Sequence, residues 1–166
     1  MADLNSIKEK IIRMSRSAST MWQLTYDAFI EHDVELISKA LEEENKLNSL
    51  EEEINKSIID LARAEFTPED NARVIVYADI AADFELIGDY CKEILERIQI
   101  KIEERLLFSE DAVKEYKELY NKTKDALEEV VFVLEKDNLA LIKEVLREEE
   151  HIDSLVDKYR QNHNQR

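Results

Sequence analysis

Glycine, proline and cysteine each occur only once in this chain of 166 residues. A single glycine argues against a glycine-rich phosphate-binding loop, and a single cysteine excludes an internal disulfide and a thiolate zinc cluster. No apolar run approaches the roughly 18 residues of a membrane-spanning helix, and residues 1–5 do not begin a secretory signal. We therefore expect a cytoplasmic chain without direct membrane insertion.

Positively charged residues are also few compared with negatively charged ones. The sequence has 23 Lys and Arg residues and 39 Asp and Glu residues, which gives a formal net charge of −16. Such a chain would not neutralise phosphates, so nucleic acid is not an expected partner. The same charge disfavours docking on anionic lipid and favours cations. No Gly-x-Ser-x-Gly motif or other arrangement for nucleophilic catalysis is found in the sequence.

The high content of charged residues, 37%, together with few turn residues, predicts an all-α fold. Thr67-Pro68 followed by two acids predicts a helix start, and Ser109 followed by two acids predicts another. Polar segments near residues 31–33 and 136–138 predict two further boundaries between helices. The chain is thus predicted to form an antiparallel bundle of five long helices, over residues 4–30, 34–65, 68–107, 110–135 and 139–163.

An internal repeat appears when the sequence is shifted by 105 residues. The shift aligns Glu43-Glu44 with Glu148-Glu149 and Ser49-Leu50 with Ser154-Leu155. The chain therefore reads as one domain over residues 1–166, with a complete three-helix unit (1–107) and an incomplete second unit (108–166) that lacks its last helix. Glu43 and Glu148 interrupt the apolar stripes of their helices, and we interpret both as boundary positions whose carboxylates reach water.

Pairs of acid or amide residues spaced i and i+4 recur on three of the predicted helices. Residues at this spacing share one face of a helix. Their oxygens could hold a hard cation, and they could equally form a solvated surface. Both interpretations remain open from spacing alone. The candidate ligands are Glu44 and Asn48, Glu85 and Asp89, and Glu149 and Asp153.

Two further residues lie close to the second pair. Gly88, in mid-helix, indicates either close helix packing or clearance beside a bound ion, since it costs about 1 kcal/mol relative to alanine. Cys91 lies in the apolar stripe that includes Phe84 and Ile98, and we interpret it as a small buried hydrophobic residue. A lone Glu-x-x-His motif, Glu148 to His151, would suit a di-iron carboxylate bundle, but such bundles use two.

The segment Asp83-Phe-Glu-Leu-Ile-Gly-Asp-Tyr90 resembles the Asp-Leu-Glu-Arg-Ile-Gly-Asp-His motif of the PhoU family. The flanking segments 67–73 and 101–112 resemble the PhoU-like C-terminal domain of bacterial sodium/phosphate cotransporters, and the tail 161–166 resembles that family's link into its final helix. The similarity covers nearly the whole chain in unbroken order.

This resemblance implies a non-enzymatic regulatory module of phosphate transport, tethered at the inner face of the membrane through its partner, the membrane domain of a sodium-dependent phosphate transporter. The family's acid pairs imply iron or zinc at the six candidate ligands, ahead of manganese or magnesium, in a structural or regulatory role and with no organic cofactor. Without a sixth helix, the uncovered apolar groove is expected to favour a dimer.

Three residues depart from the family pattern: Leu86 replaces an arginine, Tyr90 a histidine, and Asn48 a common aspartate. Because an amide is a weaker ligand than a carboxylate, the first metal cluster is expected to be weak or absent. Two alternatives of other classes remain. One is a carboxylate-bridged iron protein or oxidoreductase, and the other is a metal-free helical interaction protein.

Overall fold

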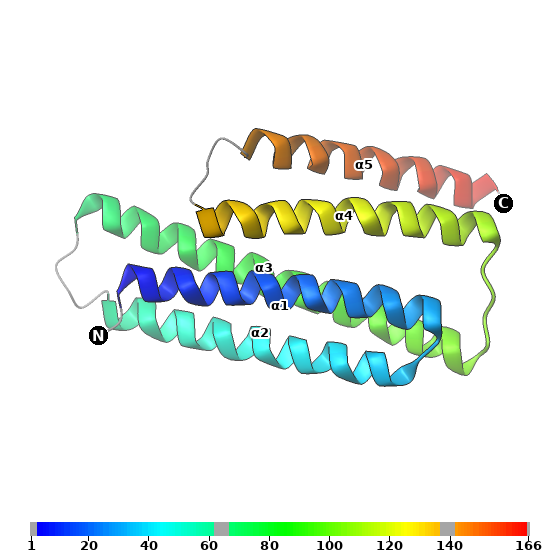
Figure 1. The fold of residues 1–166 in the computed structure, drawn as a ribbon, viewed down its shortest axis with the longest axis horizontal. Helices are drawn as coiled ribbons and strands as arrows, with labels where there is room; N and C mark the ends of the chain where they lie inside the picture. Colours follow the sequence, from blue (N-terminus) through cyan, green and yellow to red (C-terminus); the bar gives the residue numbers. More distant parts are fainter. Residues whose placement is uncertain (1–2, 62–66, 137–141, 166) are drawn as a thin grey trace. The chain divides into compact units, whose positions relative to one another are not determined.

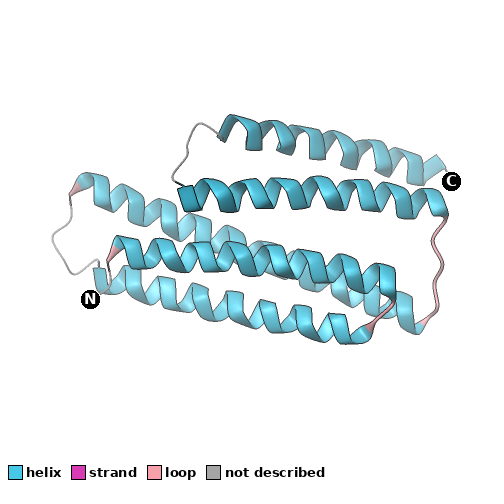
Figure 2. Cartoon of the chain, viewed as in Figure 1, coloured by secondary structure: helices cyan, strands magenta, loops and turns pink. Residues whose placement is uncertain are grey.

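A computed structural model of the chain describes residues 3–61, 67–136 and 142–165. Within these ranges every regular element is an α-helix, as Figure 2 shows, so the predicted all-α class is confirmed. The helices are α1 (Leu4–Glu31), α2 (Val34–Leu61), α3 (Pro68–Glu103), α4 (Glu110–Lys136) and α5 (Ile142–Gln165). The described part of the chain divides into two compact units, Met1–Ile102 and Glu103–Arg166.

The predicted helix starts are confirmed by their capping contacts. The backbone N–H of Asp70 donates to the Thr67 hydroxyl over 3.2 Å, and that of Ala112 donates to the Ser109 hydroxyl over 3.2 Å. Each hydroxyl satisfies a donor that has no partner within the first turn of a helix. Asp3 caps α1 in the same way, through the N–H of Ser6 at 2.7 Å.

The predicted end of the third helix differs from the structure by four residues. The third helix was expected to reach residue 107, but α3 ends at Glu103, and Arg105 has a φ of 53°. A left-handed residue terminates a helix, and its usual sequence marker is a glycine, which is absent there. The predicted stretches 62–65 and 139–141 lie outside the described residues.

The first unit is a three-helix arrangement with one apolar core. Helices α1 and α2 pack against each other, and Figure 1 shows α3 lying along them. The core centre is formed by side chains that are completely buried, among them Ile11, Met21, Leu47, Ile54 and Cys91. The only glycine of the sequence also lies in this core. Apart from Lys101, the buried positions of α3 are Ala81, Phe84, Gly88, Cys91, Leu95 and Ile98.

A lysine closes one end of this unit. Lys101 of α3 is 5% exposed, and its ammonium donates to the Phe29 carbonyl over 2.9 Å. It also lies over the Phe29 ring, 4.3 Å from the centroid, and contacts Nε2 of His32 at 2.6 Å. Burial lowers the pKa of Lys101. A cation at the last carbonyls of a helix is favourable, so Lys101 secures the end of α1 against α3.

The second unit is an antiparallel pair of helices. Helices α4 and α5 pack together. Lys122 donates to Glu148 over 3.1 Å, and Asn162 donates to Glu115 over 2.7 Å. Tyr120 and Leu155 are the most buried side chains of this pair. No described helix of either unit has an 18-residue stretch apolar enough to cross a membrane.

Candidate functional site

Acid and amide side chains of α2 and α3 come together in the first unit. Glu44 is 7% exposed, although its side chain is charged. Its Oε1 atom accepts a hydrogen bond from Asn48 over 3.2 Å and another from Lys92 of α3 over 3.0 Å. Because a buried carboxylate is costly without partners, these two donors explain how α2 tolerates Glu44 at the edge of its apolar face.

The second acid pair lies within electrostatic range of the first. Glu85 is half-buried and Asp89 is exposed, one turn later on α3. Partial burial, followed by repulsion from Asp89, Glu51 and Glu44, raises the pKa of Glu85. We name these four carboxylates, Glu44, Glu51, Glu85 and Asp89, the acid face. The structure thus brings two of the three predicted pairs onto one face of the α2–α3 packing.

Lys92 is the basic residue of this face, and the sequence patterns that predict the acid pairs do not identify it. Its hydrogen bond to Glu44 and the charges of Glu44, Asp89 and Glu96 raise the pKa of Lys92. A sequence signal was available, since Lys92 lies three residues after Asp89 and seven after Glu85, on the same side of a helix. What the sequence does not contain is the distance from α3 to Glu44 on α2.

A metal centre needs several ligands that converge on one point. Among the described residues, no three His, Cys, Asp or Glu side chains are grouped so as to hold a metal ion. At the acid face, the buried Glu44 oxygen is already bonded to Lys92 and Asn48. The side chains as arranged therefore do not fit a multinuclear cluster, and metal binding by the six candidate ligands stays a prediction.

The third pair lies in the other unit. Glu149 and Asp153 are both exposed on α5. His151, the end of the Glu-x-x-His motif, is also exposed, and Glu148 at its start is paired with Lys122. These side chains form a polar helix surface and do not converge in the way a di-iron bundle requires.

At Gly88, α3 packs closely against side chains of the other two helices. A Cβ atom at this position would lie 2.8 Å from Cδ1 of Leu47 and 4.0 Å from Sδ of Met21. Of the two interpretations of this glycine, the structure supports close helix packing. The absence of a side chain at Gly88 lets α3 approach α2, and that approach brings Lys92 within reach of Glu44.

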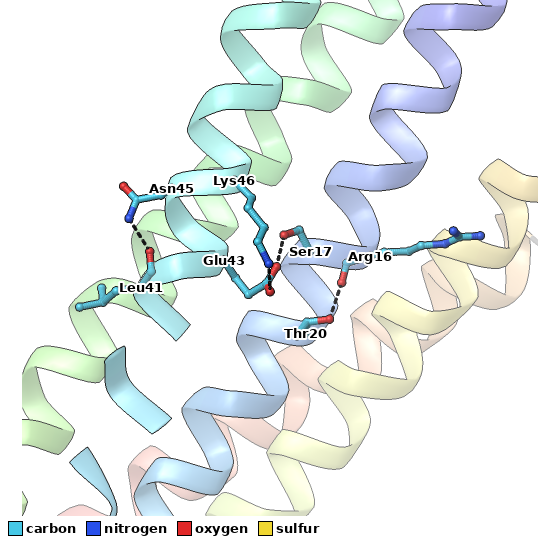
Figure 3. Close-up of polar contacts among 7 residues, drawn as sticks. All are labelled: Arg16, Ser17, Thr20, Leu41, Glu43, Asn45 and Lys46. Carbon is cyan, nitrogen blue, oxygen red and sulfur yellow. Dashed lines mark hydrogen bonds and ion pairs between the residues drawn. The ribbon is translucent and has the colours of Figure 1, made fainter. Parts of the chain in front are cut away.

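A groove of about 520 Å³ lies between α1 and α2. Figure 3 shows that Glu43 and Lys46 point toward Ser17, whereas the Arg16 guanidinium extends away from them. Ser17 donates a hydrogen bond to Glu43, and Lys46 pairs with the same carboxylate at 2.6 Å. Glu43 is half-buried, as expected of a boundary position. Its carboxylate reaches the groove and is also bonded to Ser17 and Lys46.

Comparison with known proteins gives two matches. The family model described as the PhoU domain matches residues 11–98, slightly more than half of the chain. The match lies within the first unit and includes the whole acid face together with Lys92. The chain is also similar to a phosphate-specific transport system accessory protein PhoU homolog of Clostridium acetobutylicum. The two are 22% identical over 156 residues, which cover 93% of this chain and 70% of that relative.

Proposed function

Because this chain belongs to the PhoU family, we propose that it is a regulatory module of phosphate transport that acts by binding another protein and not as an enzyme. The observation that carries the proposal is the match over residues 11–98, since it includes the core of the first unit and its acid face. The name of the Clostridium relative, a transport system accessory protein, supports the same role.

The partner we propose is the cytoplasmic side of a membrane phosphate transporter, with the chain tethered there and not inserted into the bilayer. Cytoplasmic loops of membrane proteins carry an excess of lysine and arginine. A chain of net charge −16 complements such loops electrostatically. We expect the association to weaken as salt rises, because exposed charge pairs are screened over about 8 Å at physiological ionic strength.

A deletion and complementation experiment tests the role in transport. The coding segment is removed from the source organism, and uptake of labelled phosphate is measured after growth in high and in low phosphate. We expect the deletion to alter how uptake responds to external phosphate, and the intact gene to restore the response. Uptake that responds normally in the deletion strain would contradict the proposal.

A binding experiment tests the partner. The full chain, carrying an affinity tag, is incubated with detergent-solubilised membranes at low and at high salt, and the bound proteins are identified by mass spectrometry. Recovery of a phosphate transporter, reduced at high salt, is the expected result. If low-salt eluates contain no transporter, the proposed partner is wrong.

Two alternatives predict different results. A carboxylate-bridged iron protein would purify coloured or with redox-active iron, and its ligands would converge. A metal-free helical interaction protein would bind its partner unchanged after chelation. The Lys92–Glu44 ion pair of 3.0 Å favours the second alternative over the first, because a carboxylate neutralised by a lysine needs no metal ion. A metal-free module is also compatible with regulation of phosphate transport.

A further inference from the structure

We propose that the ammonium group of Lys92 is the built-in counter-ion of the acid face, and that it takes the place of the metal ion that the acid pairs predict. This inference concerns the chemistry of one surface and does not depend on the proposed role in phosphate transport. Its basis is the disagreement between a sequence pattern that implies a metal centre and a structure in which one oxygen of Glu44 is bonded to a lysine and an amide.

The first observation is that one oxygen of Glu44 already has two hydrogen-bond donors. Its Oε1 atom accepts from Lys92 over 3.0 Å and from Asn48 over 3.2 Å. A carboxylate oxygen has two lone pairs, so both are used. The position one turn later on α2, where a second acid would complete the pair, is the neutral Asn48. The amide donates its N–H to Glu44, and only its carbonyl oxygen remains as a weak ligand.

The second observation is burial. The Glu44 side chain is 9% exposed, whereas that of Lys92 is 45% exposed. The lysine therefore reaches inward from the solvent side to a buried carboxylate. A charge buried to this degree requires a partner of opposite sign, which the lysine provides without recruiting an ion.

The third observation is the distribution of charge. The charges of Glu44, Glu51 and Asp89 repel that of Glu85, and Lys92 is the cation paired with Glu44. Lys92 also lies within electrostatic range of Asp89. A metal ion that binds the same Glu44 oxygen would have to displace the ammonium, and one that binds elsewhere on the acid face would lie close to it. Repulsion between two cations a few ångströms apart weakens metal binding, and removing the lysine charge abolishes this repulsion.

The experiment compares metal binding and thermal unfolding in the full chain. The variants are Lys92→Met, which removes the charge and keeps most of the side-chain volume, and Lys92→Arg, which keeps the charge. Lys56→Met is the matched control, because Lys56 is an exposed residue of the same unit. Mn²⁺ and Zn²⁺ are the probes, with affinity measured by calorimetry and the melting temperature measured with and without metal.

We expect Lys92→Met to melt about 3–8 °C below the parent chain, because Glu44 is left buried without its cation. We also expect it to bind metal roughly tenfold or more tightly than the parent chain, and to regain melting temperature when metal is added. Lys92→Arg and Lys56→Met should behave like the parent chain in both measurements.

A second variant keeps the test decisive if Lys92→Met fails to fold. Glu44→Gln combined with Lys92→Met removes both charges, so it should fold with nearly the parent stability and show no gain in metal affinity. The inference is overturned if the parent chain retains metal as tightly as Lys92→Met does. It is also overturned if the double variant is as unstable as Lys92→Met, since the damage would then not come from an unpaired Glu44.

Discussion

Lys122 of α4 donates a hydrogen bond to Glu148 of α5 over 3.1 Å. The residues 105 positions earlier in the chain, Ser17 and Glu43, are joined by a hydrogen bond between α1 and α2. The two units therefore use the same pair of positions to connect their first two helices, with a hydroxyl as donor in one and an ammonium in the other. The sequence repeat thus extends to a specific polar contact at both glutamates.

Removing both members of the first pair should reveal a measurable coupling. Ser17 is 8% exposed and its bond goes to a charged acceptor, so we expect a coupling free energy of about 1–2 kcal/mol between Ser17→Ala and Glu43→Ala. The measurement is a double-mutant cycle of urea unfolding. Lys122→Ala with Glu148→Ala is the matched cycle, and because those side chains are 33% and 26% exposed we expect less than 1 kcal/mol there. Equal coupling free energies in both cycles would show that burial does not determine the strength of the coupling.

Replacing Gly88 with alanine should destabilise the first unit, although alanine is the better helix former by about 1 kcal/mol. The added methyl group would lie 2.8 Å from Cδ1 of Leu47, a side chain with no exposed surface into which it could move. We expect Gly88→Ala to cost about 1–3 kcal/mol in urea unfolding, as overpacked cores do.

A compensating variant checks this reason. Leu47→Ala alone is expected to cost about 2–5 kcal/mol through the cavity it leaves. Combined with Leu47→Ala, the Gly88→Ala change should cost less than it does alone, because the methyl group then enters the vacated space. Purely additive effects would mean that the clash with Leu47 is not the cause.

The sequence predicted best those features that depend on neighbouring residues. Thr67 and Ser109 were recognised as helix caps because the capping bond spans only three residues. The end of α3 was misplaced because Arg105 adopts a left-handed conformation without the glycine that usually signals it. Local sequence was therefore sufficient to predict where helices start. It was insufficient to predict a helix end at which a residue other than glycine adopts a left-handed conformation.

The candidate site was predicted only in part, for a different reason. The i, i+4 spacing placed Glu85 and Asp89 on one face of their helix, and the structure agrees. The ion pair between Lys92 and Glu44 joins residues 48 positions apart. It depends on how closely α3 packs on α2, which Gly88 permits through the Leu47 contact. Periodicity within one helix carries no information about that distance.

Cys91 should be inert to thiol reagents while the protein is folded. Burial raises the pKa of this thiol to about 11, partly offset by a hydrogen bond with Thr25. The reactive thiolate is therefore scarce at pH 8, and the sulfur is also shielded from solvent. We expect a disulfide reagent to label less than a tenth of the native protein in the time that labels it fully in urea. Rapid labelling of the native protein would show that Cys91 is accessible in solution.

Glu85 should make the protein less stable at neutral pH than at mildly acidic pH. Partial burial, followed by Asp89, Glu51 and Glu44, raises the pKa of Glu85 above its ordinary value of 4.5. Between the ordinary and the raised pKa the folded chain binds more protons than the unfolded chain. The contribution of Glu85 to the free energy of unfolding therefore falls as pH rises through that window, and the loss persists above it.

Glu85→Gln removes this penalty, so its benefit should depend on pH. Relief of the i, i+4 repulsion with Asp89 alone is worth roughly 0.2–0.5 kcal/mol at pH 7. Below pH 4.5 the parent residue is protonated as well, so the gain should vanish there. Urea unfolding at pH 7 and pH 4 checks the prediction, with Glu93→Gln as the control because Glu93 is an exposed residue of the same helix that does not contribute to the Glu85 shift. A gain that is equal at both pH values would mean that the Glu85 charge is not the cause.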